Sequence, residues 1–227
     1  MIIVQLFKWA TERAEVIVKN PLKLVKMQEP ESPPQPCYTP EQVERMIELA
    51  DPALRAKIVF LAHTGCRFGE LRDLQWVDLD FSIGTNGFVN IRRGGSGELT
   101  KNKKSRRIPL HPMLANELNR LPRTSELVFP AGKSTKHPNG GRQSDTMLLK
   151  QVKRLCKACG FENPNQYKVH TFRHFFASMM ARNNVSYKYA LEFMGHSDSK
   201  ILDLYYTMFD EDAERAIAMI QLAPRGA

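Results

Sequence analysis

The stretch between His170 and Tyr206 collects residue types that perform acid–base and nucleophilic chemistry. His170 and Arg173 are three positions apart, so a helix would place both side chains on one face. His196 follows a glycine, and Tyr205 stands nine residues beyond it. Helices with these spacings can bring a proton acceptor, an anion-binding guanidinium and a nucleophilic hydroxyl together around one point.

A second arginine, Arg67, lies far upstream in the run Thr-Gly-Cys-Arg-Phe-Gly-Glu-Leu. A helix is expected to begin at this arginine, after a glycine that ends the preceding helix. A guanidinium at such a position can hold two phosphate oxygens beside the positive end of the helix. The alternative is a surface arginine that pairs with Glu70, three residues later.

Together these runs resemble the signature of the tyrosine recombinases, the phage-integrase family. The segment from Thr64 to Trp76, with Asp78 after it, is similar to the family's first arginine box. The run His-Thr-Phe-Arg-His at 170–174 resembles the second box, and Gly-His-Ser at 195–197 resembles the third. The resemblance covers nearly the whole chain.

The resemblance implies a full set of catalytic roles. The catalytic residues would be Arg67, Lys101, His170, Arg173, His196 and Tyr205, with Glu70 supporting the site. The arginines and His196 would stabilise the charge on a five-coordinate phosphorus, at about 3–4 kcal/mol for each donor. His170 would handle the proton of the tyrosine, and Lys101 would protonate the leaving 5′ oxygen. A covalent 3′-phosphotyrosine keeps the bond energy, so rejoining is expected to need no metal, ATP or other cofactor.

The identity of the nucleophile has an alternative. The family usually places a histidine two residues after its tyrosine, but Thr207 and Met208 stand at the two possible positions. Tyr205 is expected to be the nucleophile because nine residues separate it from His196, a spacing common in the family. Tyr206, at ten residues, is the alternative.

The basic run from Leu99 to Arg107 is predicted to contact DNA. Phosphate contact is the simplest function of such a run, and the predicted DNA-binding residues are Lys103, Lys104, Arg106 and Arg107. The family carries its general-acid lysine after the second strand, where Lys101 stands. Lys103 and Lys104 are the alternatives for that role.

A metal site is the competing interpretation of the histidines. His170 and His174 have the spacing of two zinc ligands on a helix, but the glutamate of a zinc-protease helix is absent. Cys156 and Cys159 form a C-x-x-C pair with no second pair after it. We therefore expect free thiols and no metal.

The elements that must position these residues are mostly helices. Apolar periodicity and capping residues predict helices at about 40–50, 53–64, 67–74, 112–121, 144–158, 171–181, 186–193, 199–208 and 211–222. Alternating residues predict strands within 76–92 and 100–110. The predicted fold class is mainly α with a small antiparallel β-sheet (α+β), and the resemblance implies the fold of the DNA breaking-rejoining enzymes.

The N-terminal part is predicted to be separate from the catalytic domain. An amphipathic helix is expected over residues 2–19, ended by Asn20-Pro21. The resemblance implies that residues 1–26 are the C-terminal end of a truncated core-binding (DNA-clamping) domain. The proline-rich residues 27–37 would form a linker, and residues 38–227 the catalytic domain. The alternative is an N-terminal helix that packs on the main domain.

The charge of the chain favours a polyanionic partner. The net charge is +9 and the pI about 9.5, as expected of a protein that neutralises phosphates. We expect a site-specific recombinase on double-stranded DNA, monomeric in solution and tetrameric on paired sites. The expected location is the cytoplasm, with the nucleoid and without a membrane partner. The alternatives are a type IB topoisomerase-like enzyme and a catalytically inactive DNA-binding relative.

Overall fold

The computed structural model describes residues 2–22, 36–92, 105–132, 138, 140–195 and 199–206. The chain divides into two compact units, Met1–Gln35 and Pro36–Ala227. The boundary between the units falls inside the predicted linker at 27–37. The assignment of the first unit to a DNA-clamping domain stays a prediction.

The first unit contains one described helix, α1, which spans Ile2–Glu12. The prediction of a helix over residues 2–19 is therefore wrong beyond Glu12. Glu15 has a φ of +50°, which a right-handed helix does not contain. The residues at 16–18 are all β-branched, and such side chains lower helix propensity because they restrict χ1.

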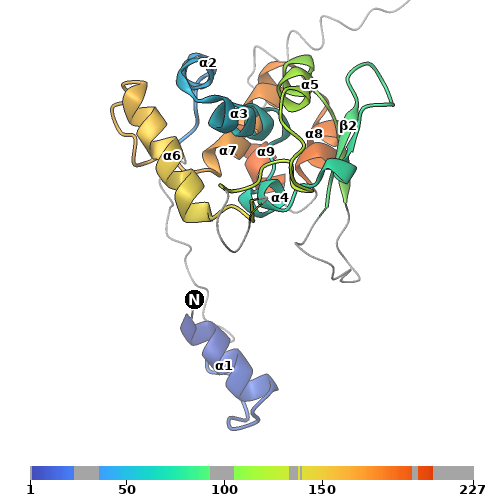
Figure 1. The fold of residues 1–227 in the computed structure, drawn as a ribbon. Coiled ribbons are helices and arrows are strands. Elements are labelled where there is room, and N and C mark those ends of the chain that lie inside the picture. The colour runs from blue at the N-terminus through green and yellow to red at the C-terminus, as the bar shows by residue number, and fades with distance from the viewer. Residues whose placement is uncertain are drawn as a thin grey trace, which may run out of the picture. The chain divides into compact units, whose positions relative to one another are not determined.

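The second unit is mainly helical, as predicted (Figure 1). Its helices are α2 (Pro40–Leu49), α3 (Pro52–Thr64), α4 (Phe68–Arg72), α5 (Pro112–Asn119), α6 (Asp145–Ala158), α7 (Thr171–Arg182), α8 (Tyr187–Met194) and α9 (Ser199–Tyr205). The predicted capping box at the start of α2 is present, with Thr39 and Gln42 exchanging hydrogen bonds of 3.0 and 3.2 Å. Gly65 ends α3 with a φ of +55°, a left-handed conformation that glycine adopts without a Cβ clash.

The sheet is small and antiparallel, as predicted, with strand order β1-β2-β3. The strands are β1 (Leu79–Asp80), β2 (Phe88–Ile91) and β3 (Arg106–Pro109). Val89 pairs with Leu79 on one side and with Ile108 on the other. The strand expected to begin near Trp76 is preceded by a 3₁₀ turn, η1 (Trp76–Asp78). That turn is closed because the side chain of Asp78 accepts a 2.9 Å hydrogen bond from the backbone N–H of Gln75.

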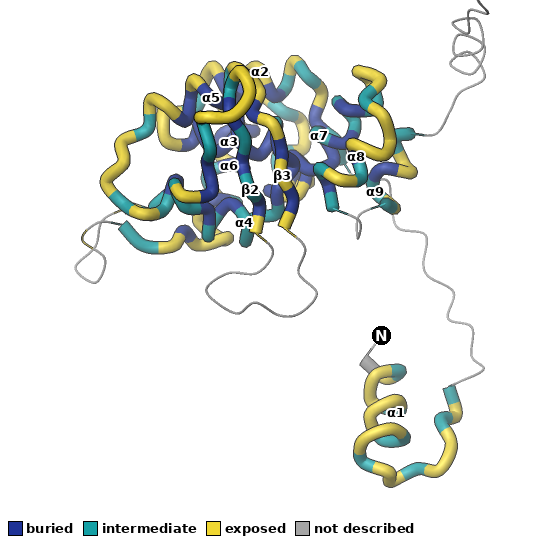
Figure 2. The backbone as a smooth tube through the Cα atoms, turned by 90° about the vertical axis from the view of Figure 1, so that its right-hand side faces the viewer, coloured by how far each residue is buried: buried dark blue, intermediate teal, exposed yellow. Residues whose placement is uncertain are grey.

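The core of the second unit is built around α3 and α7, which pack against each other (Figure 1). Ile58, Val59, Phe60 and Leu61 of α3 are all fully buried. A helix that is apolar on every side belongs in the middle of a domain, and Figure 2 shows α3 buried among its neighbours. This central position fixes the place of Gly65, and therefore of the arginine that follows it.

A second, smaller core joins α7, α8 and α9. It consists of Ala177, Met180, Ala190, Met194 and Leu202. Tyr205 and Tyr206 pack against this cluster at the end of α9. The short helix α9, which ends at Tyr205, is therefore held to α7, the helix that carries Arg173. Within the described residues, no helix is long and apolar enough to cross a membrane.

Candidate active site

Arg173 links two segments that lie next to other predicted catalytic residues. Its side chain is fully buried, which is unusual for an arginine. The guanidinium donates one hydrogen bond to the backbone carbonyl of Gly65 and another to that of Met194. Gly65 lies two residues before Arg67, and Met194 lies two residues before His196. The second predicted arginine thus holds the residues just before Arg67 and just before His196 against α7.

Glu70 lies at the centre of a cluster of arginines. Its carboxylate accepts a 2.7 Å hydrogen bond from the backbone N–H of Arg67, which caps the start of α4. The Arg67 guanidinium is 3.6 Å from the same carboxylate. This arrangement fits both the predicted supporting role of Glu70 and the alternative, an ion pair between Arg67 and Glu70. The Arg67 side chain is 33% exposed, so a ligand in solvent can reach it.

The carboxylate of Glu70 remains charged although it is buried. Burial by itself raises the pKa of Glu70, but the hydrogen bonds and charge of Arg106 and the N–H of Arg67 outweigh burial. The pKa of Glu70 is therefore lowered, and the residue carries its negative charge at neutral pH.

The predicted DNA contact of Arg106 requires an exposed side chain, but the structure buries this side chain. Its side chain is 7% exposed and binds both oxygens of Glu70, at 2.8 and 2.7 Å. The sequence contains a signal for this burial that the prediction did not use. Arg106 and Ile108 are two residues apart on a strand, so both point to the same face, and that face is the core.

Arg107 points to the opposite face of β3 and is 45% exposed on its side chain. Its guanidinium lies 4.2 Å from the centre of the Phe88 ring and 3.8 Å from Asp80. The predicted DNA contact of Arg107 fits this exposure and stays a prediction. Lys101, Lys103, Lys104 and His196, together with the helix predicted at 211–222, lie outside the described residues.

Tyr205 and Tyr206 differ in what their hydroxyl groups contact. The Tyr205 hydroxyl lies 3.4 Å from Nδ1 of His174, the residue after Arg173. The thiol of Cys37 lies near the same hydroxyl and affects its pKa. The Tyr206 hydroxyl instead donates a 2.9 Å hydrogen bond to the backbone carbonyl of Val185. Tyr205 is therefore the tyrosine whose hydroxyl faces α7, the helix that carries Arg173.

The protonation states around Tyr205 follow from burial. Burial raises the pKa of Tyr205, and the nearby thiol of Cys37 raises it further. Burial also lowers the pKa of His174, and the positive charge of Arg173 adds to this effect. A neutral phenol therefore faces a neutral imidazole at neutral pH. Among the described residues, His174 packs its ring beside that of the tyrosine, with the ring centres 6.2 Å apart.

His170 lies at the start of α7, exposed, with its ring centre 5.4 Å from that of His174 and nearly perpendicular to it. Within the part of the chain that the structure describes, no three His, Cys, Asp or Glu side chains are grouped as metal ligands. The four cysteines are free thiols, as predicted.

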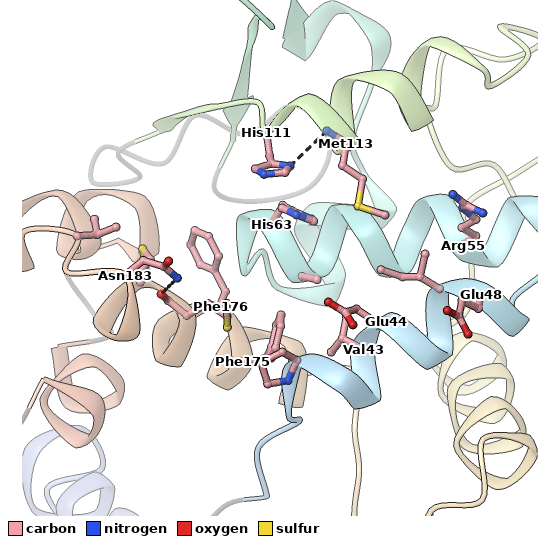
Figure 3. A pocket seen from close by; sticks show the side chains of 16 residues that line it. Val43, Glu44, Glu48, Arg55, His63, His111, Met113, Phe175, Phe176 and Asn183 are labelled. Carbon is pink, nitrogen blue, oxygen red and sulfur yellow. Dashed lines mark hydrogen bonds between the residues drawn. The ribbon is translucent and has the colours of Figure 1, made fainter.

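A groove lies on another part of the second unit. It has a volume of about 790 Å³, and its walls come from α2, α3, α7 and the start of α5 (Figure 3). His63 and His111 stack beside it with their ring centres 4.5 Å apart. Arg67, Glu70, Arg173 and Tyr205 are not among the residues that line it. The groove is therefore separate from the candidate active site.

Comparison with known proteins places the chain in a family. Residues 37–212 match the phage integrase family, and the chain belongs to this family as a catalytic domain of the tyrosine recombinase type. A tyrosine recombinase from Pseudothermotoga lettingae is 26% identical over 183 residues, which cover 78% of this chain and 58% of the relative. The XerA tyrosine recombinase of Thermococcus kodakarensis is 25% identical over 185 residues, covering 79% of this chain and 61% of the relative. The chain thus spans about three fifths of these two relatives.

Solved structures support the fold assignment. The integrase of the Tn1549 transposon, solved in complex with a circular intermediate DNA, superposes with a TM-score of 0.70 and 20% sequence identity. The match covers 94% of this chain and 75% of that structure. The predicted fold, a tyrosine recombinase catalytic domain with a small antiparallel sheet, is therefore confirmed.

Proposed function

We propose that this chain is the catalytic domain of a site-specific DNA recombinase that cuts and rejoins strands through a phosphotyrosine. The observation that carries the proposal is the pair of hydrogen bonds from Arg173 to Gly65 and Met194. These two bonds hold the segment before Arg67 and the segment before His196 against α7, the helix that the Tyr205 hydroxyl faces. Membership of the phage integrase family supports the same function.

In the proposed reaction the oxygen of Tyr205 attacks the phosphorus of a DNA phosphodiester. A bond from phosphorus to the tyrosine forms, the bond to the 5′ oxygen breaks, and that oxygen takes a proton from Lys101. Arg67, Arg173 and His196 donate to the non-bridging oxygens, where charge increases in the transition state. Attack by the 5′ hydroxyl of the same or another strand reverses the step. The phosphotyrosine conserves the bond energy, so the cycle consumes no ATP and uses no metal.

The raised pKa of Tyr205 means that the nucleophile must lose its proton during the reaction. His174 accepts a hydrogen bond from the Tyr205 hydroxyl when its Nδ1 is unprotonated. We propose that this contact holds the tyrosine in the DNA-free protein. His170, exposed at the start of the same helix, would take the proton when DNA is bound.

The proposed partners are double-stranded DNA and further copies of the chain. A net charge of +9 favours binding to the phosphate backbone. Pairing of two DNA sites would assemble four copies, as strand exchange between two duplexes requires four cleavages. Activity on chromosomal or mobile DNA would place the protein in the cytoplasm with the nucleoid.

A suicide-substrate experiment tests the proposed function. The chain is incubated in EDTA with a pool of nicked duplexes of randomised sequence, in which a cut strand diffuses away and leaves the protein attached. The expected result is a covalent protein–DNA adduct, which mass spectrometry locates on the peptide that contains Tyr205. Absence of any adduct would contradict the proposed cleavage. An adduct formed only after Mg²⁺ is added would contradict the metal-free mechanism.

A further inference from the structure

Arg106 forms a bidentate ion pair near the candidate active site. Both of its terminal nitrogens bind Glu70, one to each carboxylate oxygen, at 2.8 and 2.7 Å. The side chains of both residues are more than nine-tenths buried. A two-pronged pair of this kind fixes the carboxylate in position as well as neutralising it.

The same carboxylate also contacts Arg67. The backbone N–H of Arg67 donates to Glu70 at 2.7 Å, whereas the Arg67 guanidinium stays 3.6 Å away. The short contacts of Glu70 therefore go to Arg106 and to the backbone. The guanidinium of Arg67 makes the longer contact and keeps a third of its side chain exposed.

We propose that Arg106 is a positioning residue for the cleavage reaction. By binding both oxygens of Glu70, Arg106 fixes the carboxylate that accepts the hydrogen bond from the backbone N–H of Arg67. The start of α4, from which the Arg67 side chain extends, is thereby held in place for contact with the scissile phosphate. This inference rests on the proposed function, and it gives Arg106 a role beneath the DNA-binding surface instead of a direct phosphate contact.

The location of Arg106 connects the parts of the site. The residue begins β3, directly after the basic segment that contains Lys101. Its Cδ atom lies 4.0 Å from the point where a Cβ on Gly195 would be. Gly195 precedes His196, so the Arg106 side chain binds the supporting acid of the first box and lies near the first residue of the third. Loss of Arg106 should therefore disturb the alignment of the phosphate donors.

The test compares two substrates that differ only at the scissile group. One carries the normal phosphodiester and the other a methylphosphonate, in which a methyl group replaces one non-bridging oxygen. The methylphosphonate has no negative charge, so its cleavage depends less on the charge of Arg67. A residue that positions Arg67 should affect the two substrates unequally, whereas damage to the fold should slow both by the same factor.

We expect Arg106→Ala to slow single-turnover cleavage of the phosphodiester by roughly 10- to 100-fold, and cleavage of the methylphosphonate by less than about threefold. Arg106→Lys keeps the charge but loses the two-pronged geometry, so it should recover part of the rate. Adding Glu70→Gln to Arg106→Ala removes the carboxylate charge and should also recover part of the phosphodiester rate.

Arg55→Ala is the matched control. Arg55 pairs with the buried Glu117 at 3.0 Å, and it does not contact the arginine cluster, so its removal should leave the preference between the substrates unchanged. Equal slowing of both substrates by Arg106→Ala, with no recovery from Glu70→Gln, would overturn the positioning role. Absence of an adduct from the unaltered chain on either substrate would instead overturn the proposed function itself, and this inference with it.

Discussion

The hydroxyl of Tyr205 lies 3.4 Å from Nδ1 of His174, so the two residues connect the end of α9 to the first turn of α7. The neighbouring Tyr206 turns its hydroxyl to the Val185 carbonyl. Because adjacent residues at a helix end point in different directions, one tyrosine faces Arg173's helix and the other faces the loop after it.

Substitution of each tyrosine should therefore give different results. We expect Tyr205→Phe to abolish the covalent adduct, since no nucleophilic oxygen would remain at the site. Tyr206→Phe should retain the adduct and lose about 1 kcal/mol of stability with its hydrogen bond. Adduct yield on the nicked substrate and chemical denaturation measure the two effects. An adduct that persists in Tyr205→Phe and disappears in Tyr206→Phe would reverse the assignment.

Loss of Arg67 and loss of Arg173 should both stop cleavage, but they should differ in their effect on stability. Arg67→Ala removes a side chain that is one-third exposed, so we expect cleavage to be lost with a smaller loss of stability than in Arg173→Ala. Arg173→Ala leaves two buried carbonyls without their donors and a cavity, at about 2–5 kcal/mol. Urea denaturation of both variants distinguishes them. Equal stability of the two variants would contradict the structural role of Arg173.

Gly65 and Gly69 provide a matched pair of glycine substitutions. Gly65 has a φ of +55°, and a Cβ there would lie 2.6 Å from Cδ1 of Phe176. Gly65→Ala should lose about 1–3 kcal/mol and weaken the contact with Arg173. Nothing lies within 4 Å of a Cβ at Gly69 in α4. Gly69→Ala should gain about 0.5–1 kcal/mol. A Gly65→Ala variant as stable as the parent chain would contradict the described turn.

His174 should make the protein less stable in mild acid. Its folded pKa is below the ordinary value of 6.5, first because of burial and then because of Arg173. The unfolded chain therefore binds more protons in this range, and stability falls as the pH drops through 6.5 toward the folded pKa. His174→Gln should lose less stability than the parent chain over that interval. Melting temperatures measured across it test this, and identical pH profiles would contradict the expected contribution.

DNA binding should weaken strongly as salt increases. A chain with a net charge of +9 that contacts the phosphate backbone releases counterions on binding. The logarithm of the binding constant should therefore fall linearly with the logarithm of salt concentration. Fluorescence anisotropy with a labelled duplex measures the slope. A slope near zero would show that backbone contacts do not drive binding.

Most helices of the second unit could be predicted from sequence because their ends carry local signals. Thr39, Asp51 and Gly65 act within a few residues of their own position, so the sequence alone reveals them. The end of α1 could not be predicted in the same way. Its amphipathic pattern continues beyond Glu12, and the positive φ of Glu15 has no distinct sequence signal.

The candidate site was predictable in its residue types and less so in its contacts. Arg67, Glu70 and Arg173 were identified from the motif, and the structure brings their segments together. The bond from Arg106 to Glu70 joins residues 36 positions apart. No local pattern selects such a partner, although strand alternation places Arg106 on the buried face. The contact between Tyr205 and His174 depends likewise on how α9 packs on α7.

The hydrogen bonds of Arg173 also bear on the order in which the domain folds. One acceptor, Gly65, lies 108 positions before the arginine, and the other, Met194, lies 21 positions after it. Closing the longer loop costs more chain entropy than closing the shorter one. On a ribosome, the bond to Met194 must also wait until α8 has left the exit tunnel. A nascent chain therefore remains without an assembled candidate active site until nearly all of the domain has been synthesised.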